Sequence, residues 1–156
     1  MTDSQSRRGE DTSEMQDEEY YPEFFVSREQ ADMEGRSLQT MIINRMSYTD
    51  RQKYEDADQN VDDLVTQIVE SSSQDSDFLL PDTPLKEAVF RVMLASGNVP
   101  VTAEQISEYL SERWAMTPYP RDVSPKVIQR LLENSAAYCI AQMPQAEPDS
   151  DDEEAS

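Results

Sequence analysis

The sequence predicts a small, mainly helical domain of three helices with a minimal β element, flanked by acidic segments that are largely disordered. The first observation behind this prediction is the charge distribution. Residues 82–143 hold six basic and seven acidic residues, whereas residues 1–81 hold seven and 20, and residues 144–156 hold none and six. The second observation is helical apolar spacing within the neutral stretch. Because like charges oppose compaction and apolar burial must offset chain entropy, residues 83–143 are the predicted packed domain.

Residues 1–26 are predicted to form an acidic disordered arm that carries an aromatic motif. The polar run of residues 1–19 ends in three acids, and Tyr20-Tyr21-Pro22-Glu23-Phe24-Phe25 follows at once. Aromatic side chains offer a large apolar area at a small rotamer cost, which is why they anchor interfaces. The motif is therefore a candidate protein-docking site formed by Tyr20, Tyr21, Phe24 and Phe25. Packing of these aromatics on the chain's own domain is an equal alternative.

Residues 27–70 are predicted to be an amphipathic helical region. Ser27 and Gln30 have the spacing of a capping box, and apolar residues recur at near-helical intervals as far as Met46, although Gly35 weakens the middle. A shorter helix is clearer, because its apolar residues form a complete stripe at Val61, Leu64, Val65, Ile68 and Val69. Such a stripe usually faces a core. The alternative is a partner-binding or dimerising face that contains Leu64 and Ile68.

Residues 71–82 have the composition of a linker, rich in serine and aspartate and followed by prolines. Phe78 and Leu79 interrupt it and form a small apolar anchor, which we interpret as a further protein-binding element. After Met143, residues 144–156 are predicted to be an acidic disordered tail.

Within residues 83–143 the sequence predicts three helices and two short extended segments. Pro84 opens a helix whose apolar stripe ends at Gly97, and residues 99–101 form a short extended piece. Thr102 and Gln105 form a second capping box for a helix that reaches Trp114. A proline-containing loop follows, and Ser124-Pro125 begins the third helix. Residues 137–141 are predicted to be a strand.

This order of helix, short strand, helix, loop, helix and strand resembles a winged helix, a form of the helix-turn-helix. The phrase Val99-Pro100-Val101-Thr102-Ala103-Glu104-Gln105-Ile106 is similar to the turn between the first two helices of that superfamily. A winged helix with an acidic tail is also similar in layout to the delta subunit of bacterial RNA polymerase. That resemblance implies modulation of transcription through protein contacts, with a polyanion that competes with nucleic acid. Because Met143 is followed by Pro144 and acids, we expect the wing to lack its second strand.

The resemblance makes the third helix a candidate nucleic-acid reader. Its outward residues, with one arginine in the preceding loop, would be Arg121, Lys126, Gln129, Arg130 and Asn134. The charge balance disfavours DNA binding, since six basic residues are opposed by seven acidic ones and the flanks add further negative charge. The competing hypothesis is a protein-docking platform, with Tyr119 between two prolines as an exposed contact.

Catalytic and metal-binding motifs are scarce in this sequence. The chain has no histidine, three glycines and one cysteine, Cys139, so the usual general base, metal pairs and glycine-rich phosphate loops are lacking. Asp56 and Asp58 begin a calcium-loop pattern, which then fails because Val61 stands where glycine is needed. We therefore expect no enzyme activity, catalytic residue, metal or cofactor. No apolar run is long enough for a membrane span, and a lone cysteine suits a reducing compartment, which favours the cytoplasm, or the nucleus of a eukaryote.

The sequence thus predicts a non-enzymatic adaptor or regulatory subunit that acts through protein contacts, with the transcription machinery or a chromosome-associated complex as the expected partner. The first alternative is a DNA-binding regulator of the winged-helix type, dimeric through the helix at residues 60–70. The second is a structural accessory subunit of a larger assembly.

Overall fold

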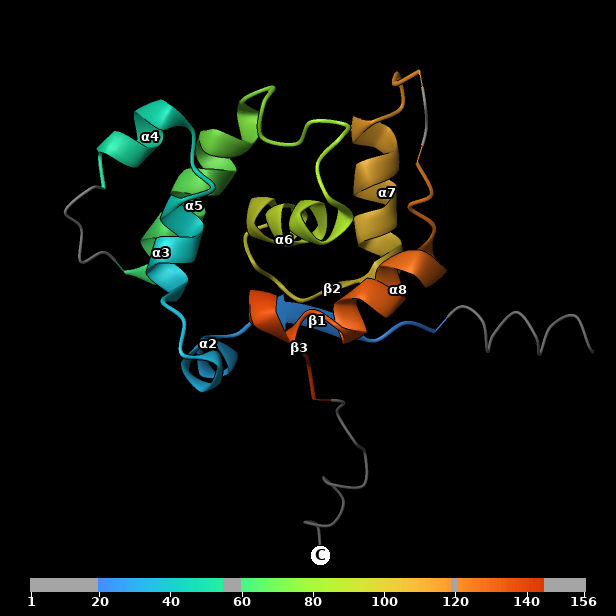
Figure 1. The fold of residues 1–156 in the computed structure, drawn as a ribbon, viewed down its shortest axis with the longest axis horizontal. Helices are drawn as coiled ribbons and strands as arrows, with labels where there is room; N and C mark the ends of the chain where they lie inside the picture. The colour runs from blue at the N-terminus through green and yellow to red at the C-terminus, as the bar shows by residue number, and fades with distance from the viewer. Residues whose placement is uncertain (1–19, 55–59, 119–120, 145–156) are drawn as a thin grey trace, which may run out of the picture.

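The computed structural model describes residues 20–54, 60–118 and 121–144, and its fold is mainly helical, as predicted (Figure 1). The α-helices are α2 (Arg28–Glu34), α3 (Leu38–Ile43), α4 (Tyr48–Gln52), α5 (Val61–Glu70), α6 (Leu85–Ala95), α7 (Ala103–Arg113) and α8 (Pro125–Glu133). Short 3-10 helices occur at η1 (Ser72–Gln74) and η2 (Ala136–Tyr138). The strands are β1 (Glu23–Val26), β2 (Val101–Thr102) and β3 (Ile140–Gln142).

The three strands form one antiparallel sheet in the order β2-β1-β3. Its central strand is the aromatic motif, so the prediction that residues up to 26 form a disordered arm is wrong for residues 20–26. β1, from the other end of the chain, pairs antiparallel with β3. The residues after Pro144, where we expected no second wing strand, lie outside the described residues. The predicted strand at residues 137–141 begins later, because residues 136–138 form η2 and Cys139 adopts a positive φ of 64° before β3 starts.

Polar caps divide the N-terminal region into short helices. Gly35, with a φ of 68°, ends α2, and the Ser37 side chain then accepts from the Thr40 N–H and starts α3. The helical spacing between Ser27 and Met46 therefore belongs to two helices, where one interrupted helix was predicted. Ser27 caps α2 as expected, and Thr102 and Gln105 form the complete capping box of α7.

Residues 71–82 connect α5 to α6, as expected of a linker, but the connection is ordered and partly buried. Ser72 and Ser73 are buried in η1, and Phe78 and Leu79 are 3% and 2% exposed. The Trp114 indole N–H donates to the Leu79 carbonyl at 3.1 Å, and Arg91 donates to the Phe78 carbonyl at 3.0 Å. The backbone of this connection is therefore held by side chains from α6 and from the end of α7.

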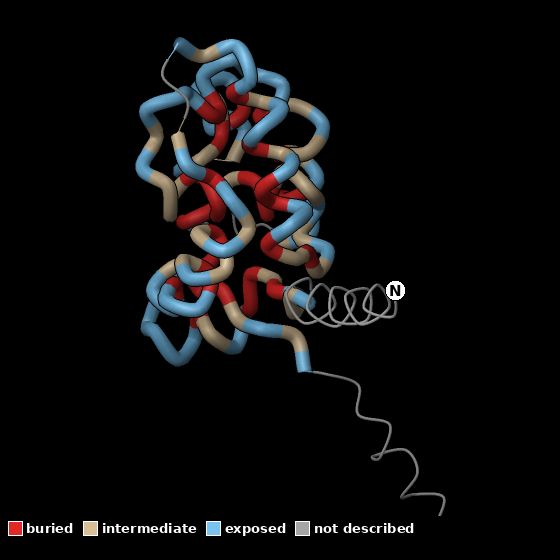
Figure 2. Tube along the Cα trace, turned by 90° about the vertical axis from the view of Figure 1, so that its right-hand side faces the viewer, coloured by how far each residue is buried: buried red, intermediate tan, exposed pale blue. Residues whose placement is uncertain are grey.

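One hydrophobic core joins the acidic and the neutral parts of the chain. Ile42, Leu64 and Ile68 from the N-terminal region are fully buried together with residues of α6, α7 and α8. Buried segments run through the whole described molecule (Figure 2). The division into a helical region at 27–70 and a separate domain at 83–143 therefore does not hold as a division of the core, because each part covers apolar surface of the other.

Candidate functional site

A cleft lies at the end of the sheet where β1 begins and β3 ends. Its volume is about 600 Å³, and its lining comes from three chain segments: Tyr20, Tyr21, Pro22, Glu23, Thr102, Met143 and Pro144. A volume of this size falls within the range of roughly 300–1,000 Å³ typical of ligand sites. The lining combines two tyrosines, two prolines and Met143 with the polar Thr102 and with Glu23, which supplies its charge. The cleft can therefore bury apolar groups beside a carboxylate.

Because side chains alternate along a strand, those of the aromatic motif in β1 face opposite sides of the sheet, one toward the core and the other away from it. Phe24 and Val26 face the core and are each 3% exposed, whereas Glu23 is exposed and Phe25 is half-buried on the opposite face. Glu23 pairs with Thr102 of β2, and Phe25 pairs with Ala141 of β3. In Figure 1, α6 and α7 lie above the sheet, and α6 contacts β1. The face with Glu23 and Phe25 is directed away from the core that these helices form.

Hydrogen bonds fix β1 at both ends. The Asn98 side chain accepts from the Val26 N–H at 2.8 Å and donates to the Val26 carbonyl at 3.0 Å. Its amide thus makes the two hydrogen bonds that the backbone of a neighbouring strand would make with Val26. Asn98 has a φ of 57°, a conformation that asparagine tolerates better than most residues. At the cleft end, the Met143 N–H donates to the Glu23 carbonyl at 2.8 Å. β1, whose first residue lines the cleft, is thus held in place at both of its ends.

Thr102 is also held firmly, because it caps α7 as well as lining the cleft. Its hydroxyl accepts from the Gln105 N–H at 3.2 Å, and its own N–H donates to the Gln105 side chain at 2.9 Å. The cleft wall formed by β2 is therefore fastened to the start of α7.

The structure separates the predicted protein-binding residues into two groups. Tyr20, which is 62% exposed, and Tyr21, which is half-buried, line the cleft, and Phe25 is half-buried on the sheet face. Five others are core residues and are unavailable to a partner in this fold: Phe24, Leu64, Ile68, Phe78 and Leu79. The predicted docking role of these five residues is wrong, because their apolar surface is already covered from within the chain. Tyr119 lies outside the described residues.

Dimerisation through the stripe of α5 is excluded by the same burial. Leu64 and Ile68 have no exposed surface, and α5 packs against α3 and α6. The outward positions of α5 are polar, with exposed Asp62, Asp63 and Thr66. A groove-binding stripe and a core stripe look the same in sequence, and here the core interpretation is correct.

The candidate nucleic-acid residues do not form a common basic surface. Arg121 donates to the Pro81 and Thr83 carbonyls, and its guanidinium carbon lies 5.0 Å from the centre of the Trp114 ring. Lys126 and Arg130 are exposed on α8. The other two candidates bond within the helix: Gln129 donates to Glu133 at 2.7 Å, and Asn134 donates to the Arg130 carbonyl at 2.9 Å. The Gln129 Oε1 is buried and has no hydrogen-bond partner among the described residues. The structure thus leaves two exposed cations on α8, with Glu133 exposed beside them.

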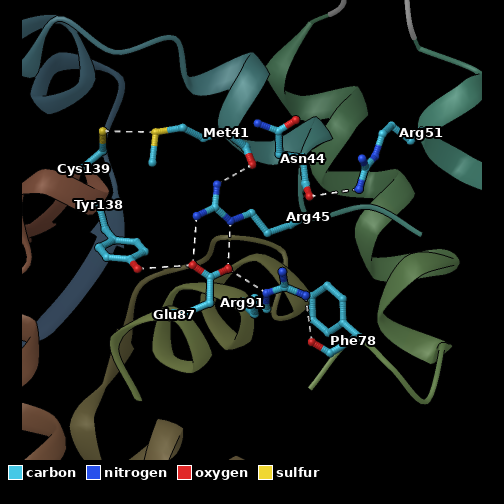
Figure 3. A network of polar contacts seen from close by, with 9 residues as sticks. All are labelled: Met41, Asn44, Arg45, Arg51, Phe78, Glu87, Arg91, Tyr138 and Cys139. Carbon is cyan, nitrogen blue, oxygen red and sulfur yellow. Dashed lines mark hydrogen bonds and ion pairs between the residues drawn. The ribbon is translucent and has the colours of Figure 1, made fainter. Parts of the chain in front are cut away.

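A polar cluster around Glu87 joins the turn after α3 to α6 and η2 (Figure 3). The Glu87 carboxylate accepts two hydrogen bonds from Arg45 at 2.9 Å, one from Arg91 at 2.7 Å and one from the Tyr138 hydroxyl at 3.2 Å. Burial alone would raise the pKa of Glu87, but the hydrogen bonds and charges of the two arginines lower that pKa to about 2. Burial and the nearby Glu87 charge raise the pKa of Tyr138. The Glu87 carboxylate is thus paired with two guanidinium groups, and the cluster is a structural tie between the turn after α3, α6 and η2.

Asp50 is a buried carboxylate with a different set of partners. Ser72 donates to it at 2.7 Å and Gln67 at 2.9 Å. Burial would raise the pKa of Asp50, and hydrogen bonds from nearby serines and Gln67 outweigh that effect and lower the pKa. This cluster fastens α4 to α5 and η1. Across residues 20–54, 60–118 and 121–144, no group of three or more acidic or cysteine side chains is arranged to hold a metal ion.

Comparisons with known proteins give no relative for this chain: no family model, curated protein or solved structure matches it. None of the helices in the described part of the chain is long and apolar enough to cross a membrane.

Proposed function

We propose that this chain is a non-enzymatic adaptor or regulatory subunit that docks a partner protein at the sheet-end cleft. The observation that supports the proposal is the cleft itself, where Tyr21 and Met143 offer apolar surface on a backbone fixed by pairing and capping. Fixed apolar anchors reduce the entropy lost on binding, and such anchors dominate protein interfaces. The transcription machinery stays the expected partner, and the cytoplasm or nucleus the expected compartment, on the sequence arguments alone.

Site-specific photocrosslinking in cells tests this proposal. A benzophenone amino acid placed at Met143 in the cleft should capture a protein, and the same group at Glu108, on the exposed face of α7, should not. The crosslinks should survive nuclease digestion. Crosslinks of equal yield from both positions would contradict docking at the cleft.

A matched pair of methionine variants then measures the contact with the purified partner. Met143→Gln removes apolar surface in the cleft, whereas Met116→Gln changes the same side chain where it is 92% exposed and outside the cleft. We expect Met143→Gln to weaken binding about tenfold and Met116→Gln to change it by less than about twofold. Equal effects of the two substitutions would remove the cleft from the interface. Salt-sensitive DNA binding that is lost on changing Lys126 and Arg130 to alanine would favour the DNA-reader alternative.

A further inference from the structure

A second hollow, which we call the α5 groove, lies between α5 and the turn that ends α6. Its volume is about 440 Å³, and one of its walls is the backbone turn Gly97-Asn98. The other wall is a stripe along α5 at intervals of three and four residues: Asp62, Val65, Thr66, Val69 and Glu70. Residues with this spacing share one helix face, so the two carboxylates stand at opposite ends of the groove with the valines between them. Asp62 and Glu70 are eight residues apart, which separates them by about 12 Å along the helix axis.

The wall opposite α5 is fixed by hydrogen bonds. The Gly97 N–H donates to the Leu94 carbonyl at 3.0 Å, the Asn98 N–H donates to the Met93 carbonyl at 3.0 Å, and the Asn98 amide holds Val26 of β1. Gly97 has a φ of 82°, and a Cβ at this position would lie 4.0 Å from Val69 Cγ2. Glycine therefore leaves the floor of the groove uncovered beside Val69, and the groove needs no rearrangement to receive a ligand.

The charges of the α5 groove are negative. Asp62 and Glu70 are its charged lining residues, and no lysine or arginine lines it. Gly97 and Asn98 also place the C-terminal end of α6 here, which is the negative end of the helix dipole. Arg28 pairs with Asp62 at 3.1 Å from outside the lining, but the two side chains are 61% and 83% exposed, so this attraction is weak. Glu70 is exposed and makes no ion pair with another residue of the described ranges.

The spacing of the carboxylates and the floor between them restrict the ligand further. Carboxylates about 12 Å apart cannot share one metal ion, whose oxygen ligands lie at about 2.0–2.6 Å. Val65 is 6% exposed and Val69 is half-buried, so the surface between the acids is apolar. Alkyl chains that carry ammonium groups lie along apolar surface while their charged ends reach polar groups.

We propose that the α5 groove binds a linear aliphatic polyamine, with its alkyl chain over the two valines and its terminal ammonium groups at Glu70 and Asp62. The Thr66 hydroxyl donates to the Asp62 carbonyl at 3.0 Å, so its oxygen still accepts a hydrogen bond from an ammonium group along the chain. This site goes beyond the proposed function and does not depend on it, because the α5 groove and the sheet-end cleft share no lining residue.

Calorimetric titration of the full chain with two linear diamines tests the proposal. Octanediamine and butanediamine carry the same charge, but only the longer one spans from one carboxylate to the other over the valines. We expect octanediamine to bind at one site and about fivefold more tightly than butanediamine. Equal affinities, or no binding of octanediamine, would overturn the proposal.

Two matched pairs of charge variants locate the binding. Glu70→Gln removes a carboxylate of the groove and should weaken octanediamine binding about fivefold, whereas Glu108→Gln on the exposed face of α7 should change it by less than about twofold. Arg28→Ala releases Asp62 and should tighten binding about fourfold, whereas Arg51→Ala changes the net charge equally at another exposed position and should have less than about a twofold effect. Equal effects within each pair would show a response to net charge alone and overturn the proposal.

A matched pair of valine variants tests the apolar floor. Val69→Thr keeps the side-chain shape and places a hydroxyl in the groove, whereas Val99→Thr makes the same change where the residue is 55% exposed and outside the lining. We expect Val69→Thr to weaken octanediamine binding about threefold and to leave the weaker binding of butanediamine within about twofold. Equal effects of Val69→Thr and Val99→Thr would mean that the alkyl chain does not lie in the groove.

Discussion

The segment from β1 to α5 and the segment from α6 to β3 differ strongly in charge, yet they contribute alike to one core. Residues 23–70 hold five basic and 11 acidic residues, whereas residues 85–142 hold six of each. Leu64 and Ile68 in the acidic segment are as completely buried as Ile106 and Leu110 in the neutral one. The charge of a segment thus describes the outward faces of its helices. It does not show whether the inward faces are buried.

The comparison also shows why the acidic segment is not a separate arm. Its inward stripe on α5 covers α6, and β1 supplies the centre of the sheet. A stretch of about sixty residues buries only roughly 60% of its unfolded surface, which leaves little stability of its own. The acidic segment completes a core that the neutral segment only begins.

The largest expected effect comes from separating the two segments. A chain of residues 82–143 alone should fail to fold, because it loses the central strand β1 and exposes the surface of α6 that Leu64 and Ile68 cover. Thermal unfolding followed by circular dichroism should show no cooperative transition, whereas the full chain should show one. A cooperative transition of the fragment close to that of the full chain would mean that the neutral segment is an independent domain after all.

A smaller effect is expected from truncating one core leucine in each segment. Leu64→Ala and Leu110→Ala remove equally buried side chains, so each should lower the free energy of unfolding by about 2–5 kcal/mol. Urea unfolding of the two variants measures this directly. Val99→Ala, at a position that is 55% exposed, is the control and should cost less than about 0.5 kcal/mol. If Leu64→Ala cost no more than this control, the two segments would not share a core.

The tie between the segments at Glu87 predicts a dependence of stability on pH. The folded pKa of Glu87 is lowered from 4.5 to about 2, so the unfolded chain binds the proton more readily than the folded chain. The stabilisation is therefore complete above about pH 5 and is lost as the pH falls towards 2, up to about 3 kcal/mol in all.

Urea unfolding of the parent and of Glu87→Gln at several pH values measures this contribution. The difference between the two proteins should shrink as the pH falls from about 5 to about 3. Tyr138→Phe, which keeps the charge pairs with Arg45 and Arg91 and removes one hydrogen bond to Glu87, should retain the pH dependence of the parent. A difference that stays constant with pH would show that the carboxylate charge does not link the segments.

The smallest effect is expected at the ion pair between Arg28 and Asp62. The two charges lie 3.1 Å apart, but the side chains are 61% and 83% exposed, so water and salt weaken their attraction. Arg28→Ala should change the free energy of unfolding by less than about 0.5 kcal/mol, and added salt should not alter the result. A loss as large as that of a core leucine would mean that surface charge, rather than apolar burial, joins α2 to α5 within the acidic segment.

Local features of the fold could be predicted from the sequence because they depend on neighbouring residues. Ser27 and Thr102 cap helices at the predicted positions, Pro125 begins α8, and the stripe of α5 is continuous. The cleft could not be predicted in the same way. The aromatic motif drew attention to Tyr20 and Tyr21, but nothing in the sequence placed Thr102, Met143 and Pro144 opposite them.

By itself, the sequence determined that the fold is mainly helical and where α2, α5, α6, α7 and α8 begin, since capping and apolar periodicity act within a few residues. It did not separate α3 from α2 or indicate α4 as an element of its own. Only the tertiary structure decided that the aromatic motif is the central strand, that the acidic helices share the core, and that Tyr20 and Pro144 line one cleft. Asn98 holds Val26 across a separation of 72 residues, and Arg45 pairs with Glu87 across 42. Such contacts depend on how the whole chain packs around one core, and the spacing of residues within a short segment does not predict them.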